Sequence, residues 1–551
     1  MLSFEREGNT MKKLKIFTTI LASILLLTAC GSAAVSPQND AAKEDNAVEI
    51  NLSDEVITVD QKPVGTNEED AVYTANDIVY YESGKDFTYG EGGEKDAHSP
   101  EEAAAHTVVH ITKAGTYILS GKLSQGQIAV DLGKEAEEDP DAVVTLVLNG
   151  VDITCEVAPA VIFYNVYECG NTDVENAGKD VDTSAAGANV IIADDTQNTI
   201  NGSYVERIYK PGSVVLNGDK TEVEDADKLH KYDGAFYSKM SMNINGGTKN
   251  TGVLTINAQN EGLDTELHLT INGGNIHINS GNDGINTNED GVSVTTMNGG
   301  VLTITVTGET GEGDGIDSNG WLVINGGTVI ASACSDSADA GIDSDMGIHI
   351  NGGTVAATGH MLDRIEDGGQ NYAVFQFVQK QDGNAVISLK DADGTAVLEY
   401  APGNDYSVLV CSSPDLTEGT YTLWSDGEQM AGQGGGMFGG GFRPDMMPEG
   451  MGPDGKTHEG NTPPEFSKGE LPQEPSNGDF QQRPEGALGN PPSFEGEPPK
   501  GMEGFGGPGK GEGGMWRPDN NSGEAQELTA EFEIVEGGNV FSNVSYLNQE
   551  V

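Results

Sequence analysis

The chain has 551 residues, of which 88 are Asp or Glu and 29 are Lys or Arg, so its formal net charge is −59. This length allows a large buried core. The acidity argues against nucleic acid as a partner, because phosphates are bound by Lys and Arg, and it disfavours direct binding of anionic polymers.

The first segment has the features of a bacterial lipoprotein signal. A basic stretch begins at Met11, and an apolar run follows from Ile16 to Leu27. The run is too short to span a membrane and is typical of a signal peptide. It ends in Leu-Thr-Ala before Cys30, which resembles a lipobox. We therefore expect a signal peptide over 1–29 with the true start at Met11. Lipid on Cys30 would be the only attachment to the membrane, on the outer face of the bacterial cytoplasmic membrane.

Residues 30–50 are small, polar and charged, which is typical of a flexible tether. From residue 51 to 360 the chain consists of short runs with apolar residues at alternate positions, a pattern that predicts β-strands with one buried face. No segment of this part shows the 3.6-residue period of an amphipathic helix.

A repeat organises residues 233–358. Asn-Gly-Gly triplets begin 26 or 27 residues apart, at Asn245, Asn272, Asn298, Asn325 and Asn351. A second signature, Gly-(Leu/Ile)-(Asp/Asn)-(Thr/Ser), occupies 262–265, 284–287, 315–318 and 341–344. Three short strands and tight glycine turns in each period fit one coil of a right-handed parallel β-helix. The predicted fold class is therefore all-β, with this solenoid over 51–360.

Stacking of such coils would align acidic residues into a ladder, because neighbouring strands lie about 4.8 Å apart. Carboxylates at that spacing repel one another unless water or a cation screens them, and hard oxygen ligands on irregular turns suit Ca²⁺. The candidate calcium ligands are Glu261, Asp264, Asp283, Asp314, Asp317, Asp339 and Asp343. Asp264, Asp317 and Asp343 are expected to point outward, and Asn286 interrupts their row. Turns that bond their own backbone through Asp and Asn remain the alternative.

The stretch Leu146–Ile153, the stretch Asp233–Lys239 and the repeated Ile-Asn-Gly-Gly and Asp-Gly-Ile units resemble a family of bacterial surface carbohydrate-binding proteins. The resemblance covers about residues 50–425 and the last 25 or so. It implies a polysaccharide-lyase-like right-handed β-helix with bound calcium that binds cellulose and acidic sugars such as polygalacturonate. Asn286 and Ala340 depart from the acidic pattern, which puts metal ligands at those two coils in doubt.

Beyond residue 360 the repeat ends. Strand patterns over 361–426 predict a small antiparallel unit that caps the open edge of the last coil. Residues 427–523 are rich in Gly, Pro and Met and are predicted to be disordered. Residues 524–551 regain a strand pattern and are predicted to complete the cap.

The chemistry of the repeat favours binding over catalysis. A calcium-dependent lyase needs a base, usually Lys or Arg, and the coils from Thr251 to Asp363 contain neither. Their histidines, expected to be surface residues, are His268, His277, His349 and His360. No catalytic residue is predicted, but a lyase or another pectin-active enzyme remains an alternative, as does a structural spacer or adhesin.

Binding would involve a plant or bacterial cell-wall polysaccharide, and a uronate ligand would need calcium to bridge it to the acidic chain. The candidate aromatic surface for a sugar ring consists of Tyr232, Tyr237 and Trp321, with an ordinary buried role as the alternative. Cys155 and Cys169 lie in no metal-binding spacing, and whether they pair is left open.

Overall fold

The protein is described by a computed structural model that places residues 46–170, 172–437 and 528–547. These residues are nearly all β, which confirms the predicted all-β class. Their helices are α1 (Pro100–Ala104) and two 3-10 helices, Lys134–Glu138 and Val174–Asn176. None of these helices has the length and apolarity that crossing a membrane requires. The predicted signal peptide, Cys30 and most of the Gly/Pro/Met-rich segment lie outside the described residues.

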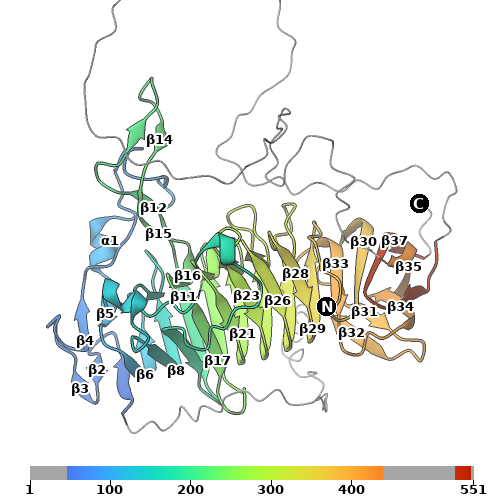
Figure 1. Ribbon diagram of the computed structural model, residues 1–551, viewed down its shortest axis with the longest axis horizontal. Coiled ribbons are helices and arrows are strands. Elements are labelled where there is room, and N and C mark those ends of the chain that lie inside the picture. Colours follow the sequence, from blue (N-terminus) through green and yellow to red (C-terminus); the bar gives the residue numbers. More distant parts are fainter. Residues whose placement is uncertain (1–45, 171, 438–527, 548–551) are drawn as a thin grey trace, which may run out of the picture.

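Three rows of parallel strands stack along the long axis of the molecule (Figure 1). The first row contains β1 (Val48–Leu52), β6 (Gly115–Leu123), the start of β8 (Val144–Thr154), β10 (Ala188–Ile192), β17 (Met242–Gly246), β20 (Leu269–Ile271), β23 (Val294–Met297), β26 (Trp321–Ile324) and β28 (Gly347–Ile350).

The second row contains the end of β8, β11 (Gln197–Gly202), β18 (Val253–Ala258), β21 (Asn275–Ser280), β24 (Val301–Val306), β27 (Thr328–Ser332) and β29 (Thr354–Gly359). The third row contains β5 (Thr107–Ile111), β7 (Gly126–Val130), β9 (Val161–Phe163), β16 (Gly234–Ser238), β19 (Glu261–Thr265), β22 (Ile285–Thr287) and β25 (Ile316–Ser318). Antiparallel β4 (Val72–Ala75) closes this row.

The register of the third row explains how the repeat positions the acidic residues. Leu263, Ile285 and Ile316 are successive partners, and the residues that follow them pair in the same order. The buried aliphatic ladder consists of Leu263, Ile285, Ile316 and Ile342, and the aromatic ring of Phe236 extends it. Burying one such side chain contributes roughly 1.5–3 kcal/mol. The aliphatic ladder therefore fixes the position of each carboxylate along the stack of strands.

Glycines allow the turns to stack so closely. A Cβ built on Gly284 would lie 2.2 Å from Cγ2 of Ile304, and the Gly284 backbone has no left-handed φ. Close approach of the next coil, rather than a positive φ, is thus the reason for glycine there. The second glycine of the Asn-Gly-Gly triplet is the opposite case, since Gly274 has a φ of 94°.

The end of the stack is covered by a second group of strands, because β29 pairs antiparallel with β33 (Tyr406–Ser412). The other strands of this group are β30 (Tyr372–Gln381), β31 (Ile387–Lys390), β32 (Ala396–Tyr400), β34 (Gly419–Ser425), β35 (Glu428–Met437), β36 (Phe532–Ile534) and β37 (Gly538–Tyr546). They surround a separate core in which the rings of Phe375, Phe532 and Phe541 pack within 5.2 Å of one another.

Two boundaries differ from those predicted. Strand β35 lies wholly beyond residue 427, where the sequence predicts disorder. It forms because Met430 and Ala431 are buried and β35 pairs with β37. Strand β1 begins at Val48, inside the predicted tether, because it adds to the first row beside β6. The Gly-rich composition of 428–437 concealed the first of these strands.

A lobe projects from the N-terminal end of the stack (Figure 1). It contains two short antiparallel pairs, formed by β12 (Val205–Tyr209) with β15 (Lys228–Tyr232) and by β13 (Val215–Leu216) with β14 (Val223–Asp225). Two further short strands, β2 (Thr58–Val59) and β3 (Lys62–Pro63), pair beside β1. Strand β15 leads directly into β16, so the lobe lies next to the acidic turns of the third row.

Candidate metal centres and carbohydrate-binding region

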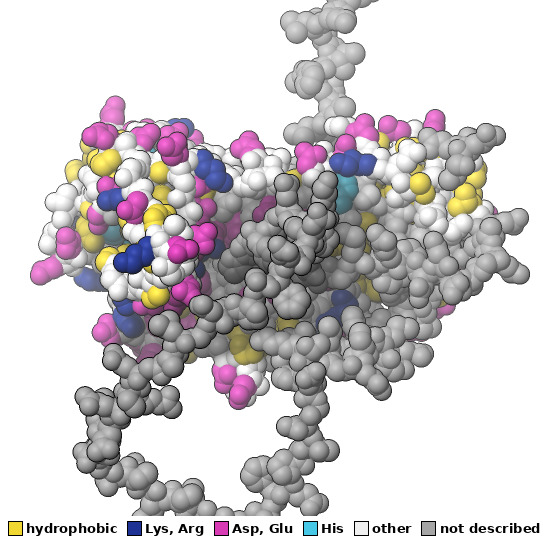
Figure 2. Space-filling view, turned by 90° about the horizontal axis from the view of Figure 1, so that it is seen from above, with side chains coloured by type: hydrophobic (Ala, Val, Ile, Leu, Met, Phe, Trp, Pro, Cys, Tyr) yellow, Lys and Arg dark blue, Asp and Glu magenta, His cyan; other side chains and the backbone are white. Residues whose placement is uncertain are grey.

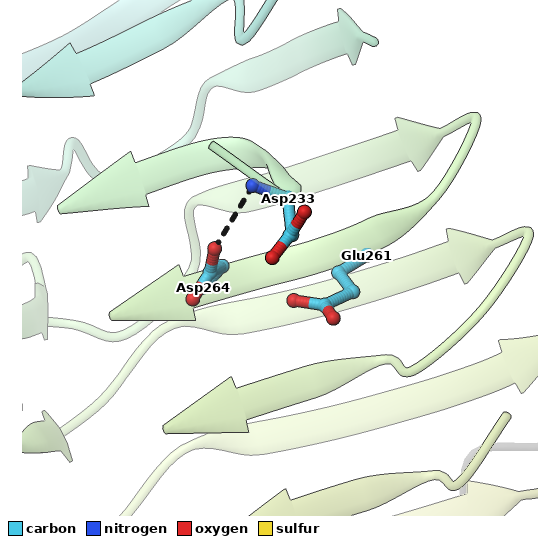
Figure 3. A group of neighbouring side chains, drawn as sticks. All are labelled: Asp233, Glu261 and Asp264. Atoms are coloured by element: carbon cyan, nitrogen blue, oxygen red, sulfur yellow. Dashed lines mark hydrogen bonds between the residues drawn. The ribbon is translucent and has the colours of Figure 1, made fainter. Parts of the chain in front are cut away.

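Three buried carboxylates converge where β15 passes into β16 and where β19 begins (Figure 3). Asp233 precedes β16, and Glu261 and Asp264 belong to the adjacent β19. One oxygen from each of the three lies within 4.8 Å of the others. An ion with Ca–O distances of about 2.4 Å contacts oxygens separated by at most about this much. We call this group the buried carboxylate cluster.

Protein encloses this cluster on every side. The relative exposure of Asp233, Glu261 and Asp264 is 7%, 5% and 0%. Asp264, which the sequence predicted to point outward, is thus covered by the residues that lead out of the lobe. Burial, followed by repulsion from neighbouring carboxylates, raises the pKa of both Glu261 and Asp264 well above the usual range. Burial likewise raises the pKa of Asp233.

Lys231 provides part of the compensating charge. Its Nζ lies 2.6 Å from Oδ2 of Asp233. Burial disfavours the ammonium, but attraction to Asp233 outweighs it, and the pKa of Lys231 is raised. Lys231 is therefore held as a cation and is unsuited to act as a base. Three carboxylates and one ammonium leave a formal charge of −2, which one divalent cation would neutralise.

Two buried oxygens of this region have no hydrogen-bond partner among the described residues: Oε2 of Glu261 and Oδ1 of Asn286. The other oxygen of Glu261 accepts a hydrogen bond from Nδ2 of Asn286 at 3.1 Å. An unpartnered buried oxygen costs about 1–3 kcal/mol, so native proteins rarely leave one unused. Carboxylate and amide oxygens are the donors that Ca²⁺ prefers, and the cluster therefore fits a hard divalent cation.

The remaining contacts hold Asp264 in place. Its Oδ2 accepts from the backbone N–H of Asp233 at 3.2 Å, and its Oδ1 accepts from Nδ2 of Asn288 at 2.5 Å. Asn286, which the sequence treats as an interruption of the acidic row, lies in register with Asp264. An amide at this position donates to one carboxylate of the cluster and adds no further negative charge.

A second group of carboxylates lies farther along the same row. One oxygen each of Asp314, Asp317 and Asp343 lies within 4.8 Å of the others, and all three side chains are half-buried. Burial, and then repulsion from Asp283, raises the pKa of Asp314 well above the usual range. Burial and the neighbouring Asp363 raise the pKa of Asp343 to about 7. We call this group the accessible carboxylate cluster.

Two predicted ligands serve the backbone instead. Oδ1 of Asp283 accepts from the N–H of Asp314 at 2.7 Å, and Oδ2 of Asp339 accepts from the N–H of Gly313 at 2.6 Å. Asp314 combines both roles, because its Oδ1 also accepts from the N–H of Ala340. The hydrogen-bonded turn ladder that the sequence left open therefore exists beside the carboxylate clusters, and Asp283 and Asp339 are absent from both clusters.

The sequence analysis missed Asp233, Asp363 and Lys231. Asp233 stands before Gly234, and the register of β16 with β19 aligns Gly234 with Glu261, so the Asp-Gly pair contained a signal. Asp363 accepts a hydrogen bond from the N–H of Ser344, and it follows the last repeat, where no period predicts its position.

The predicted aromatic surface is wrong for two of its three members. Tyr232 and Tyr237 are buried, and their rings meet edge to face at 5.0 Å. The hydroxyl of Tyr237 donates to Oε1 of Glu266 at 2.7 Å. Trp321 is half-buried on β26 of the first row. Tyr237 lies on β16 of the third row, and Tyr232 is the last residue of β15. The three residues therefore present no common face to a sugar.

Two further expectations are settled. His268 is 2% exposed, and its Nδ1 accepts from the N–H of Val294, so it is no surface residue, whereas His277 is exposed. Cys155 and Cys169 are both free, and the disulfide left open by the sequence is therefore absent.

The architecture defines an all-β protein with stacked parallel strands and two candidate metal centres on one row of turns. Residues 105–372 match the model of a protein family described as "Carbohydrate-binding domain-containing protein". This match confirms the resemblance drawn from the repeats, and it spans both carboxylate clusters.

Two individual proteins resemble parts of the chain. A carbohydrate-binding domain-containing protein of Acetivibrio thermocellus is 32% identical over 170 residues, which cover 30% of this chain and 43% of the relative. The chain therefore spans less than half the length of this curated relative. A solved structure, described as a polysaccharide lyase-like protein from C. thermocellum in a gadolinium derivative, is 20% identical, with a TM-score of 0.32. The alignment covers 56% of this chain and 90% of that one, and at so low a TM-score we infer nothing from the match.

Proposed function

We propose that this protein is a cell-surface lipoprotein that binds polysaccharide, acidic or cellulosic, through a stack of strands whose acidic turns hold calcium. One observation carries the calcium part of the proposal: the unpartnered buried oxygens of Glu261 and Asn286 beside three converging carboxylates. The family match over the same residues supports the carbohydrate part.

Asp233, Glu261 and Asp264 would hold a structural ion. Their burial leaves no surface on which a polymer could reach the metal. Bound calcium would supply positive charge that replaces the protons retained by these carboxyl groups. The role of this cluster is to fasten the lobe to the third row.

Asp314, Asp317 and Asp343 suit a different role, because they are half-buried and open to solvent. A uronate brought near them would meet only negative charge, and a divalent cation held by these residues reverses that repulsion. The accessible carboxylate cluster is thus the place at which calcium would bridge an acidic sugar to the protein.

We propose further that the three rows form a right-handed parallel β-helix. The repeated 26- to 27-residue spacing and the parallel register of all three rows support this arrangement. Right-handed connections are the strong preference for parallel strands. An experimental structure in which the chain winds left-handed would refute it.

Anchoring through Cys30 is likewise a proposal, since that residue lies outside the described part of the chain. Expression in a bacterial host with a labelled fatty acid should label the wild-type chain and leave Cys30→Ser unlabelled. Equal labelling of the two chains would remove Cys30 as the anchor.

An array of cell-wall polysaccharides, probed with the full chain in calcium and in EDTA, tests the function. Retention of a polysaccharide in calcium that EDTA weakens is the expected result. An absence of retention on every polysaccharide in both buffers would refute binding. Ultraviolet absorbance of unsaturated sugar ends in the same samples would reveal lyase activity, which this proposal does not expect.

A further inference from the structure

A cleft of about 230 Å³ opens at the N-terminal end of the molecule, and its wall β15 leads directly to Asp233 of the buried carboxylate cluster. One wall is the loop of residues 78–89, and the other consists of β12, β15 and Pro211 of the projecting lobe. Acidic and hydrophobic side chains lie side by side at this end of the molecule when it is viewed from above (Figure 2).

The two walls are fastened to each other by the backbone. The N–H of Tyr209 donates to the carbonyl of Tyr89 at 2.8 Å, and the N–H of Glu91 donates to the carbonyl of Arg207 at 2.9 Å. Arg207 also contacts Oε1 of Glu91 at 3.1 Å. The cleft is therefore formed before any ligand arrives, which reduces the entropy lost on binding.

Three tyrosine rings lie among the aliphatic side chains of the lining. Tyr80, Tyr89 and Tyr209 are all half-buried, so each ring has a packed part and an accessible part. Tyr89 is held edge to face against buried Tyr81 at 5.1 Å, and Arg207 lies 5.8 Å from the centre of the Tyr209 ring. Rigid rings of this kind offer contact area at a low entropic cost.

A few polar groups complete the cleft. His230 lines it, and Nδ1 of this ring is hydrogen-bonded to the hydroxyl of Tyr232 at 2.6 Å, which fixes the orientation of the imidazole. Glu82 lines the same cleft and is paired with Lys85 at 3.0 Å. Apolar walls with a small number of fixed polar groups are typical of sites for small organic ligands.

We propose that this cleft binds a neutral pyranose ring of a polysaccharide, with Tyr80, Tyr89 and Tyr209 stacking on the sugar and Glu82 and His230 bonding its hydroxyl groups. The proposal rests on the function proposed above and names a site and a ligand class for it. A β-linked glucose-type ring has its hydroxyl groups equatorial, so its C–H groups form the flat apolar faces that tyrosine rings match.

Charge decides between a neutral and an acidic sugar. The lining residues of the cleft include a glutamate and no lysine or arginine, and the nearby Lys85 and Arg207 are already paired with Glu82 and Glu91. A uronate would therefore find no unpaired cation here. The acidic sugar belongs at the accessible carboxylate cluster, and the neutral one belongs at this cleft.

The family match covers only one wall of the cleft. Residues 105–372 match the family, and that range contains β12 and β15 but not the wall at 78–89. Half of the lining residues thus lie outside the matched range.

The test compares the affinity of full-chain variants for hydroxyethylcellulose, a neutral β-glucan, and for polygalacturonate in calcium. Tyr80→Ala and Tyr209→Ala should each weaken hydroxyethylcellulose binding about tenfold and leave polygalacturonate binding unchanged. The matched control is Phe87→Ala, which removes a 48% exposed aromatic ring from the same loop outside the cleft and should change neither affinity.

Wild-type affinity of both tyrosine variants for hydroxyethylcellulose, or equal loss of affinity for the two polymers, would overturn the cleft assignment and leave the proposed function intact. If the wild-type chain binds no polysaccharide at all, both proposals fail. Tyr80→Phe, which keeps the ring, should bind nearly as well as wild type; a loss as large as that of Tyr80→Ala would contradict stacking. Unchanged melting temperatures confirm that each variant is folded.

Discussion

Burial of the Glu261 carboxylate lowers the stability of the fold, and the same carboxylate is suited to bind a metal ion. One oxygen of this carboxylate has no partner among the described residues, and burial, followed by repulsion from Asp264 and Asp233, raises its pKa. Such a group destabilises the fold when it is charged and alone. It becomes favourable only when a cation is bound.

Glu261→Gln should therefore reduce the rise in melting temperature that calcium causes to less than half its wild-type value. At a calcium concentration 100 times the Kd, a filled site stabilises the folded state by about 2.7 kcal/mol. In EDTA the variant should melt no lower than wild type, because the amide removes a buried acid. Thermal unfolding with and without calcium measures both effects.

Glu289→Gln is the control for this variant, because Glu289 is exposed on a turn close to Asn288. It should retain the full calcium response. An undiminished calcium response of Glu261→Gln would contradict calcium binding by the buried carboxylate cluster.

The raised pKa of Asp343 predicts how the free energy of unfolding depends on pH. Its pKa in the folded chain is about 7, against 3.8 for an ordinary aspartate, because of burial and the neighbouring Asp363. The folded state thus binds a proton more tightly than the unfolded state. The stabilisation is fully present below about pH 4 and is lost as the pH rises through 7.

In EDTA, wild-type protein should lose stability to urea between pH 4 and pH 7, and Asp343→Asn should flatten this dependence. Asp314, Asp339 and Asp363 face the same group, so the variant reduces the slope without abolishing it. Calcium should also reduce the slope, because it replaces the proton. A slope that Asp343→Asn leaves unchanged would show that this carboxyl is not the titrating group.

Individual site residues were predictable only where the repeat located them. Asp264, Asp317 and Asp343 follow an aliphatic residue at equivalent positions, so the period reveals them. Their burial was not predictable, because the lobe that covers Asp264 comes from residues before the repeat. Tyr232 and Tyr237 were misjudged for the same reason: alternation within a strand does not show what lies on top of it.

At the scale of the strand, asparagines join neighbouring turns. Each amide nitrogen donates to the amide oxygen of the preceding turn, at 3.0, 2.9, 2.9 and 2.8 Å along the row. The row consists of Asn245, Asn272, Asn298, Asn325 and Asn351. An interior member takes part in two such bonds, and Asn351 at the end takes part in one.

Asn298→Ala should lower the free energy of unfolding by about 1–2 kcal/mol, since it removes two hydrogen bonds. Asn351→Ala, which removes one, should cost about half as much. Urea denaturation compares the two variants directly. An equal or reversed order would show that the amide row does not contribute bond by bond.

The strands themselves were largely readable from the sequence. Alternation and the Asn-Gly-Gly period indicated the runs that became β17 to β29. The missed element, β35, has a Gly-rich sequence, and it is a strand because β37 provides its hydrogen-bond partners. Local composition does not contain that information.

At the scale of the whole molecule, the end of the stack depends on residues distant in sequence. Strand β37 pairs with β30 and β35, and its Phe541 packs against Phe375. A chain that stops after residue 527 should expose this core, melt at least several degrees lower and aggregate. A chain that stops after residue 547 keeps β37 and should behave as wild type. Equal melting temperatures of the two truncated chains would contradict this role.

The period of 26 or 27 residues made a stacked all-β fold predictable, because each repeat can bury its apolar face only against a neighbour. The antiparallel strand pairs inside the projecting lobe were not predictable, since residues 204–232 have neither repeat nor strong alternation. Both the enclosure of the buried carboxylate cluster and the aromatic cleft depend on that lobe.

The most direct test of calcium-dependent polysaccharide binding is a calorimetric titration of the full chain with cell-wall polysaccharide, in calcium and after removal of calcium by EDTA. We expect binding in calcium, with the affinity for polygalacturonate lost in EDTA and restored when calcium is added back. Absence of binding to any polysaccharide in calcium, or an affinity for polygalacturonate that EDTA leaves unchanged, would contradict it.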